Sequence, residues 1–427
     1  MNHGTKLDYS GLSIVSLWTI PSTIVDLDCS NNLIKKFKGL PESLRVLICS
    51  HNDISLIRNI PDSLIVLDCS FNKVKTIRGL PESLLYFNCS YNLVNLINGL
   101  PKSLENFNCS NNSIKTIKSL PESLLNFSCK GNSIKFIKGL PESLVSFNCS
   151  SNTIKKIRNL PLNLKVFDCS DNSISKIEGL PETLVKFICS ENNLTRISGL
   201  PKGLLEFDCS VNNIKTIEGL PVSLEDFSCV GNDIVRIEGL PKSLKEFNCG
   251  ANQISKIENL PENLKIFNCG GTTIEIIENL PKDLKEFYCH LNSVSVIENL
   301  PKGLELLYCD DNDIKQIKCL PQSLKTFYCG HNDIKVIENL PLGLKHLGLS
   351  MENVKFVDNV SIENIRFSLK GYSAIKRIQL RMKRRYRLKD SAARVIQKGL
   401  YNWLWKPEGI VARVETRNLR ETLGMFL

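Results

Sequence analysis

The sequence predicts a repeat protein of the α/β repeat class, mostly β. We expect a right-handed parallel solenoid of about 17 coils with one short strand per coil, and a small C-terminal helical region. Proline recurs every 20 residues at 17 positions, from Pro21 to Pro341. Cysteine keeps the same step at 16 positions, from Cys29 to Cys329. A fixed period of this length indicates one small unit stacked many times, which builds long exposed surfaces rather than enclosed pockets.

Each coil follows one frame, which we number from its proline as position 1. Residues 41–60 read PESLRVLICSHNDISLIRNI, and the shared frame is P-x-S-L-x-x-(L/F)-x-C-S-x-N-x-I-x-x-I-x-G-L. Apolar residues alternate at positions 7 and 9, here Leu47 and Cys49, which predicts a strand with both side chains facing the core. Positions 6 and 8 then face solvent on the concave side. The asparagine at position 12 is expected to bond backbone groups of the neighbouring coil, and Thr272, its one replacement, predicts a weak coil.

The cysteine ladder has two interpretations. Adjacent coils would place cysteine Cα atoms about 5 Å apart, which is within disulfide range, so metal or redox chemistry is one interpretation. The other is that cysteine serves as a small apolar residue that fits a narrow coil. We favour the second, because the chain has no Cys-x-x-Cys pair. Cys319 stands in place of the frame's glycine and is expected to be exposed. We therefore predict no metal and no cofactor.

Charge divides the chain into two regions. Residues 361–427 hold 16 Lys/Arg and 5 Asp/Glu, a net of +11, within a total of +10. The remaining residues are therefore almost neutral, which indicates regions with different roles. We predict a capping coil over residues 1–20, a solenoid over 21–360, and a C-terminal cap with a basic helical tail over 361–427.

The chain shows no sign of export or membrane insertion. Residues 1–10 are polar and lack the apolar segment of a signal peptide. No stretch approaches the roughly 20 apolar residues that a membrane helix needs. Seventeen cysteines without such a signal are typical of free thiols in a reducing compartment. We expect a cytoplasmic protein.

The concave strand positions hold the predicted partner-binding residues. Position 8 carries three successive tyrosines, which a histidine accompanies, and acidic residues occupy nearby concave positions. Large rigid aromatic side chains are frequent anchors in protein interfaces. The alternative is that the tyrosines only stack on one another. The predicted residues are Tyr288, Tyr308, Tyr328, His290, Asp208, Asp226 and Glu246.

The C-terminal tail predicts a basic amphipathic helix from Tyr372 and a second helix from Asp390 to before Pro407. Such a helix suits a calmodulin-like protein, nucleic-acid phosphate or an anionic membrane surface. A solvated end without a ligand is the remaining interpretation. The basic residues predicted for this role are Arg381, Lys383, Arg384, Arg385 and Arg387.

The repeat frame resembles the 20-residue leucine-rich repeats of bacterial effector proteins, and still more those of giant-virus leucine-rich repeat proteins. The segment SAARVIQKGLYNWLWKP at 391–407 resembles a helical tail that recurs in giant-virus proteins. The first resemblance implies the solenoid fold and says little about function. Bacterial effectors of this type can carry a ubiquitin-ligase domain with a catalytic cysteine. Residues 361–427 hold no cysteine, so we do not expect that activity here.

The sequence favours a non-enzymatic protein-interaction scaffold that binds a partner protein on its concave face, and the resemblance implies a viral protein. The alternative is an adaptor whose basic tail binds nucleic acid, an anionic membrane surface or a calmodulin-like protein while the solenoid recruits. An enzyme is not expected, because the five histidines form no triad or metal spacing and no glycine-rich phosphate loop occurs. We expect a monomer that, if viral, resides in the host cytoplasm.

Overall fold

The computed structural model describes residues 5–17, 20–117, 119–317, 319–349, 355–357 and 366–367. The chain forms a parallel β-solenoid of about 17 coils, as predicted. It divides into two compact units, unit 1 (Met1–Asp226) and unit 2 (Phe227–Leu427). No helix occurs among the described residues, so none there could cross a membrane. The helical tail predicted from Tyr372 lies outside the described residues, and the short strand at 366–367 falls in the predicted C-terminal cap.

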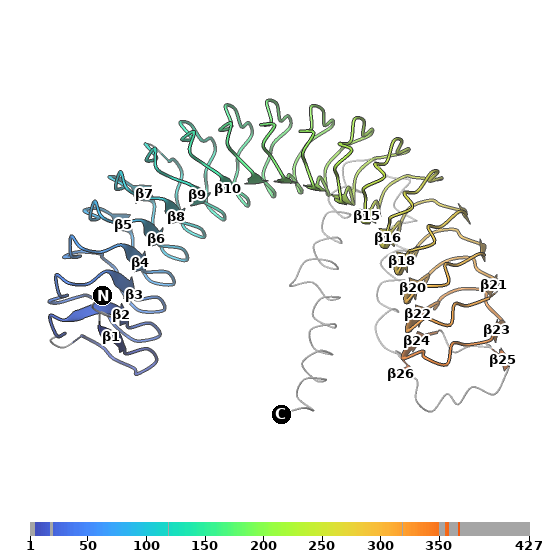
Figure 1. The fold of residues 1–427 in the computed structure, drawn as a ribbon, viewed down its shortest axis with the longest axis horizontal. Coiled ribbons are helices and arrows are strands. Elements are labelled where there is room, and N and C mark those ends of the chain that lie inside the picture. The colour runs from blue at the N-terminus through green and yellow to red at the C-terminus, as the bar shows by residue number, and fades with distance from the viewer. Residues whose placement is uncertain are drawn as a thin grey trace, which may run out of the picture. The chain divides into compact units, whose positions relative to one another are not determined.

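In unit 1 one strand per coil lines the inner face, and two short strands lie on the outer side (Figure 1). The inner strands are β1 (Thr5–Asp8), β2 (Ile24–Asp28), β3 (Val46–Ile48), β4 (Val66–Asp68), β6 (Tyr86–Asn88), β8 (Asn106–Asn108), β9 (Asn126–Ser128), β10 (Ser146–Asn148), β11 (Val166–Asp168), β12 (Lys186–Ile188) and β13 (Glu206–Asp208). The outer strands are β5 (Thr76–Ile77) and β7 (Leu96–Ile97), and β14 (Asp226–Ser228) contains the unit boundary.

Unit 2 repeats this arrangement, with a longer series of outer strands (Figure 1). Its inner strands are β15 (Glu246–Asn248), β16 (Ile266–Asn268), β18 (Glu286–Tyr288), β20 (Leu306–Tyr308), β22 (Thr326–Tyr328), β24 (His346–Gly348) and β26 (Arg366–Phe367). Its outer strands are β17 (Ile276–Ile277), β19 (Val296–Ile297), β21 (Gln316–Ile317), β23 (Val336–Glu338) and β25 (Lys355–Val357).

The strands are parallel and keep the 20-residue register, so equivalent residues stack into ladders. Phe147 pairs with Phe167, and Phe267 pairs with Phe287. The position 7 phenylalanines stack with ring centroids 5.6–5.8 Å apart within each unit. This aromatic ladder and the leucines of position 4 form the core, because both are almost fully buried.

The asparagine at position 12 bonds neighbouring coils together, as predicted. Asn152 Nδ2 donates to the carbonyl oxygens of Cys129 (3.0 Å) and Cys149 (3.1 Å). Its Oδ1 accepts from Ile134 N at 2.9 Å. One buried side chain thus satisfies backbone groups in two coils, which explains why the position repeats so strictly.

The proline and serine of each coil make the turn that precedes the strand. Leu64 N donates to Pro61 O at 3.1 Å and closes the turn. Ser63 Oγ then donates to Leu44 O of the preceding coil at 2.7 Å. The turn and this bond between coils account for the P-x-S-L start of each coil.

The 16 in-phase cysteines are buried free thiols, whereas Cys319 is exposed as predicted. Burial raises the pKa of the Cys29 thiol to about 12, and it raises the pKa of Cys49 well above its usual value. Thiols with such high pKa values are protonated at neutral pH, which fits the apolar packing role.

Candidate functional site: the tyrosine stripe on the inner face

Position 8 at the end of each inner strand has a structural task in most coils. An Asp or Asn there accepts a hydrogen bond from the backbone N–H of position 10 and so closes the turn after the strand. Ser70 N donates to Asp68 Oδ1 at 2.9 Å, and Gly270 N donates to Asn268 Oδ1 at 2.9 Å. The same bond occurs at Asp28, Asn88, Asn108, Asn148, Asp168, Asp208 and Asn248.

Three successive coils of unit 2 replace this capping residue with tyrosine. Tyr288, Tyr308 and Tyr328 end β18, β20 and β22, and all three are half-buried. A tyrosine side chain has no oxygen close to its own backbone and cannot make the capping bond. These coils have therefore exchanged a local structural bond for a surface of aromatic rings, which we call the tyrosine stripe.

The rings of the tyrosine stripe contact one another at an angle. The centroids of Tyr288 and Tyr308 are 6.2 Å apart with planes at 50°, and those of Tyr308 and Tyr328 are 5.1 Å apart with planes at 64°. Tilted and edge-to-face contacts of this kind are favourable for aromatic pairs. Self-stacking, the alternative considered from sequence, is thus part of the structure, and it holds the rings in place.

His290 lies beneath the tyrosine stripe rather than on its surface. It is only 7% exposed, and its ring meets the ring of Tyr308 edge to face at 4.8 Å. A Cβ atom on Gly270 would lie 2.3 Å from His290 Cε1, so the absence of a side chain in that coil makes room for the imidazole. Burial lowers the pKa of His290 to about 4, so the ring is neutral at physiological pH. The structure therefore assigns it a supporting role and not the contact role predicted from sequence.

Asp310 supports the next coil and was missed by the sequence analysis. It is 3% exposed, and its Oδ1 accepts from Gly330 N at 2.6 Å. Asp310 thus supplies an acceptor for the position 10 N–H of Gly330, which Tyr328 leaves uncapped. Burial raises the pKa of Asp310 to about 7, although the bond from Gly330 lowers it.

The predicted acidic residues fall into different places. Asp226 lies on β14 at the unit boundary, and Glu246 is exposed on β15 in unit 2. Asp208, in unit 1, is occupied in the turn cap with Ser210 N at 2.8 Å, and burial raises its pKa. Glu286, which precedes the stripe by two residues, accepts a hydrogen bond from Tyr288 Oη at 2.7 Å.

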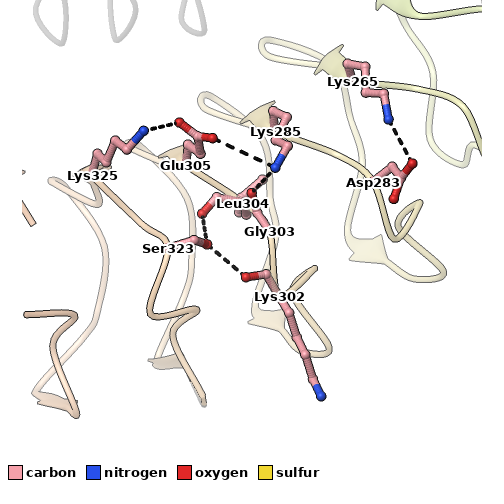
Figure 2. A network of polar contacts seen from close by, with 9 residues as sticks. All are labelled: Lys265, Asp283, Lys285, Lys302, Gly303, Leu304, Glu305, Ser323 and Lys325. Carbon is pink, nitrogen blue, oxygen red and sulfur yellow. Dashed lines mark hydrogen bonds and ion pairs between the residues drawn. The ribbon is translucent and has the colours of Figure 1, made fainter. Parts of the chain in front are cut away.

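Polar side chains at the start of the strands bind adjacent coils of unit 2 together (Figure 2). Glu305 forms ion pairs with Lys325 at 2.5 Å and with Lys285 at 3.8 Å. Lys265 pairs with Asp283 at 2.8 Å. These exposed pairs contribute little stability individually, but they place each of these lysines against a carboxylate of an adjacent coil.

Unit 1 carries a different aromatic cluster at position 11. His51, Phe71 and Tyr91 stack face to face with centroids 4.2 Å apart and planes within 10° of parallel. Their backbones are left-handed, with φ between 51° and 53°. Because these rings cover one another's faces, the cluster offers solvent mainly ring edges, unlike the tyrosine stripe.

Two predictions lie beyond these contacts. The basic tail residues Arg381, Lys383, Arg384, Arg385 and Arg387 lie outside the described residues. Within the described part of the chain, no group of three or more His, Cys, Asp and Glu side chains is arranged to hold a metal ion.

Solved structures show what this chain is similar to. No protein-family model and no curated protein matches it. YopM from Yersinia enterocolitica is similar with a TM-score of 0.74 at 24% identity, over 85% of this chain and 91% of YopM. The functional domain of InlJ from Listeria monocytogenes, which includes a cysteine ladder, gives 0.60 at 22%, over 77% of this chain and 73% of that domain. CroV588, a circular leucine-rich repeat protein of a giant virus, gives 0.56 at 22%, over 85% of this chain and 65% of CroV588. These likenesses show the leucine-rich repeat fold, in agreement with the repeat frame.

Proposed function

We propose that the protein is a non-enzymatic protein-interaction scaffold that binds a partner protein on the inner face of unit 2, through the tyrosine stripe. One observation carries this proposal. Three consecutive coils lack a turn-capping bond that nine other coils keep, and each lacks it in favour of an aromatic side chain. Local structural rules are broken in this way mostly where a surface has a function.

The stripe suits an interface in physical terms. Tyrosine brings a large contact area at a small cost in side-chain entropy, and it is enriched among interface hot spots. Contacts among the rings, with His290 beneath Tyr308, already restrict their rotamers. A partner would therefore lose little free energy in ordering them.

The test is partner capture with the full chain in cytoplasmic extract. Tyr288, Tyr308 and Tyr328 are changed together to alanine and compared with the wild type. The matched control changes His51, Phe71 and Tyr91 to alanine, which removes the same number of exposed rings from unit 1. We expect the specific partner to be lost from the tyrosine variant only. Equal retention by both variants would refute the stripe as the binding surface.

A second proposal concerns the basic tail, because residues 361–427 carry a net charge of +11 on an otherwise nearly neutral chain. In this adaptor the tail binds phosphate-rich nucleic acid or an anionic membrane surface, or a calmodulin-like protein. Changing the five tail residues from Arg381 to Arg387 named above to glutamine should abolish salt-sensitive retention on RNA and on anionic vesicles. The control changes five exposed lysines of unit 1 to glutamine. Similar losses in both variants would argue against a tail-specific site.

We place the protein in a cytoplasmic, reducing compartment, also as a proposal. Seventeen free thiols support it, since this number is unusual where disulfides form readily. The viral origin suggested by the resemblance of the repeat frame stays a prediction.

A further inference from the structure

We propose that the tyrosine stripe recognises a basic, arginine-bearing segment of the partner protein. This inference rests on the proposed function and adds to it the chemistry of the partner. It follows from the charges around the stripe and from the way in which its rings are arranged.

The strands of the tyrosine stripe are acidic or neutral. β18, β20 and β22 read EFY, LLY and TFY and contain no lysine or arginine. Glu286 is held beside the first ring by the bond from Tyr288 Oη at 2.7 Å. No ion pair joins Glu286 to any residue that the structure describes.

The nearby lysines do not cancel this charge. Lys265, Lys285 and Lys325 stand at the starts of the strands, where Asp283 and Glu305 pair with them (Figure 2). These three lysines are thus paired within the fold, whereas Glu286 is not. Lys345, at the start of β24, also has no ion pair in the described part of the chain, but it lies three coils from Glu286. A cationic group of a ligand complements Glu286.

The rings can accept a cation. Neighbouring planes are tilted by 50° and 64°, so the tyrosines are not stacked flat on one another as the His51, Phe71 and Tyr91 rings are. A guanidinium group binds the face of a tyrosine through cation–π attraction and stacks on it as a plane. The same group can donate two hydrogen bonds to a carboxylate such as Glu286. An arginine side chain can therefore contact both a tyrosine ring and the Glu286 carboxylate, whereas lysine lacks the planar group and the paired donors.

The experiment measures binding of a fluorescein-labelled dodecapeptide of alternating glycine and arginine to the full chain by fluorescence anisotropy. We expect Tyr308→Leu, which keeps apolar bulk but removes the ring, to weaken binding about 3- to 10-fold. Glu286→Gln keeps an acceptor for Tyr288 Oη and should weaken binding about 3-fold or more. Tyr308→Phe keeps the ring face and should bind nearly as the wild type does. Tyr91→Leu in unit 1 is the matched control and should leave binding unchanged.

Several outcomes would overturn the inference. Equal binding by Tyr308→Leu and the wild type, with folding verified by circular dichroism, would show non-specific attraction. Stronger binding of a glycine–glutamate dodecapeptide would assign the surface to an anionic ligand held by the lysines. If binding appeared only after Arg381, Lys383, Arg384, Arg385 and Arg387 were changed to glutamine, the chain's own tail and not a partner would be the occupant. If partner capture depends on the tyrosines but the arginine peptide does not bind, the inferred arginine recognition is wrong and the proposed function stands. If neither partner capture nor peptide binding depends on the tyrosines, both the inference and the proposed function are wrong.

Discussion

The ring of Tyr328 lies directly against the backbone of Gly348 in the next coil. A Cβ atom built on Gly348 would lie 2.2 Å from Tyr328 Cδ1, far inside van der Waals contact. The last ring of the tyrosine stripe thus takes its position from a residue that has no side chain, and Gly270 makes room for His290 in the same way.

Gly348→Ala should therefore displace Tyr328 and weaken partner or arginine-peptide binding several-fold, because the new methyl group and the ring cannot both keep their places. Overpacking of this kind costs about 1–3 kcal/mol of stability. The matched control is Gly343→Ala, whose added Cβ would meet no atom within 4 Å. Binding affinity and urea unfolding of the two variants check this, and equal behaviour would count against the packing described.

The pH dependence of stability should reveal two buried titratable residues of unit 2, Asp310 and His290. The pKa of Asp310 is raised from 3.8 to about 7, so its contribution is present below pH 3.8 and is lost as the pH rises to 7. The pKa of His290 is lowered from 6.5 to about 4, so its contribution is present above pH 6.5 and is lost as the pH falls to 4. Between about pH 4 and pH 6.5 the stability lost through Asp310 as the pH rises is offset by the stability gained through His290, so the two contributions largely cancel.

Asp310→Asn removes one of these effects and can still accept the bond from Gly330. The stability of this variant relative to the wild type should increase by about 3 kcal/mol between pH 4 and pH 7, because the slope of about 1.4 kcal/mol per pH unit flattens near each pKa. Denaturant unfolding at half-unit pH steps measures this difference. A difference that does not change with pH would mean that Asp310 is ionised in the folded protein throughout this range.

Thr272→Asn should strengthen the one coil that lacks the ladder asparagine. Thr272 Oγ1 reaches Cys269 O at 2.9 Å, but threonine has no second group to repeat the bond that Ile234 N makes to Asn252 Oδ1. Restoring the amide should add about 1–2 kcal/mol to the free energy of unfolding. Thr273→Asn, at the exposed neighbouring position, is the control and should change stability little. A destabilised Thr272→Asn variant would show that this coil has adapted its backbone to threonine.

Cys319→Gly should also stabilise the protein. Cys319 is exposed and has φ of 57°, a left-handed conformation that glycine, asparagine or serine adopts at this position in other coils. Glycine removes the steric strain, and we expect a gain of roughly 0.5–1 kcal/mol in thermal or urea unfolding. Cys329→Gly, which empties a buried position, should instead destabilise the protein. A loss of stability in both variants would indicate that Cys319 makes a favourable contact.

The periodic part of the fold could be predicted from sequence because it follows from repetition. Leu47 and Cys49 alternate with solvent-facing residues in a pattern that strands alone explain, and Asn52 recurs where a turn leaves backbone groups unsatisfied. The strand alternation depends only on neighbouring residues, and the asparagine bonds recur from coil to coil, so both can be read from the repeat. The turn made by proline and the bond made by Ser63 were not predicted, because they depend on where the preceding coil places its carbonyl oxygens.

The candidate site was predicted only in part. The three tyrosines could be found because their step matches the strand register, but their tilt depends on rotamers that no spacing defines. His290 was assigned to the surface because the glycine that lets it pack inward is 20 residues away. In many coils an Asp or Asn at position 8 stands two residues before a serine, as in Asp68-Cys69-Ser70, and this spacing signals the capping bond. This spacing also predicts that a tyrosine at position 8 removes the capping hydrogen bond to the backbone N–H of position 10.

Site-specific photo-crosslinking tests the central claim most directly. The photoreactive residue p-benzoylphenylalanine is placed at position 308 of the full chain, and in a second variant at position 108, which occupies the same coil position in unit 1. Both variants are irradiated in cytoplasmic extract. We predict one dominant cross-linked protein at position 308, absent at position 108 and lost when Tyr288 and Tyr328 are also changed to alanine. Equal cross-linking at both positions, or a cross-link only at position 108, would contradict the tyrosine stripe as the partner-binding surface.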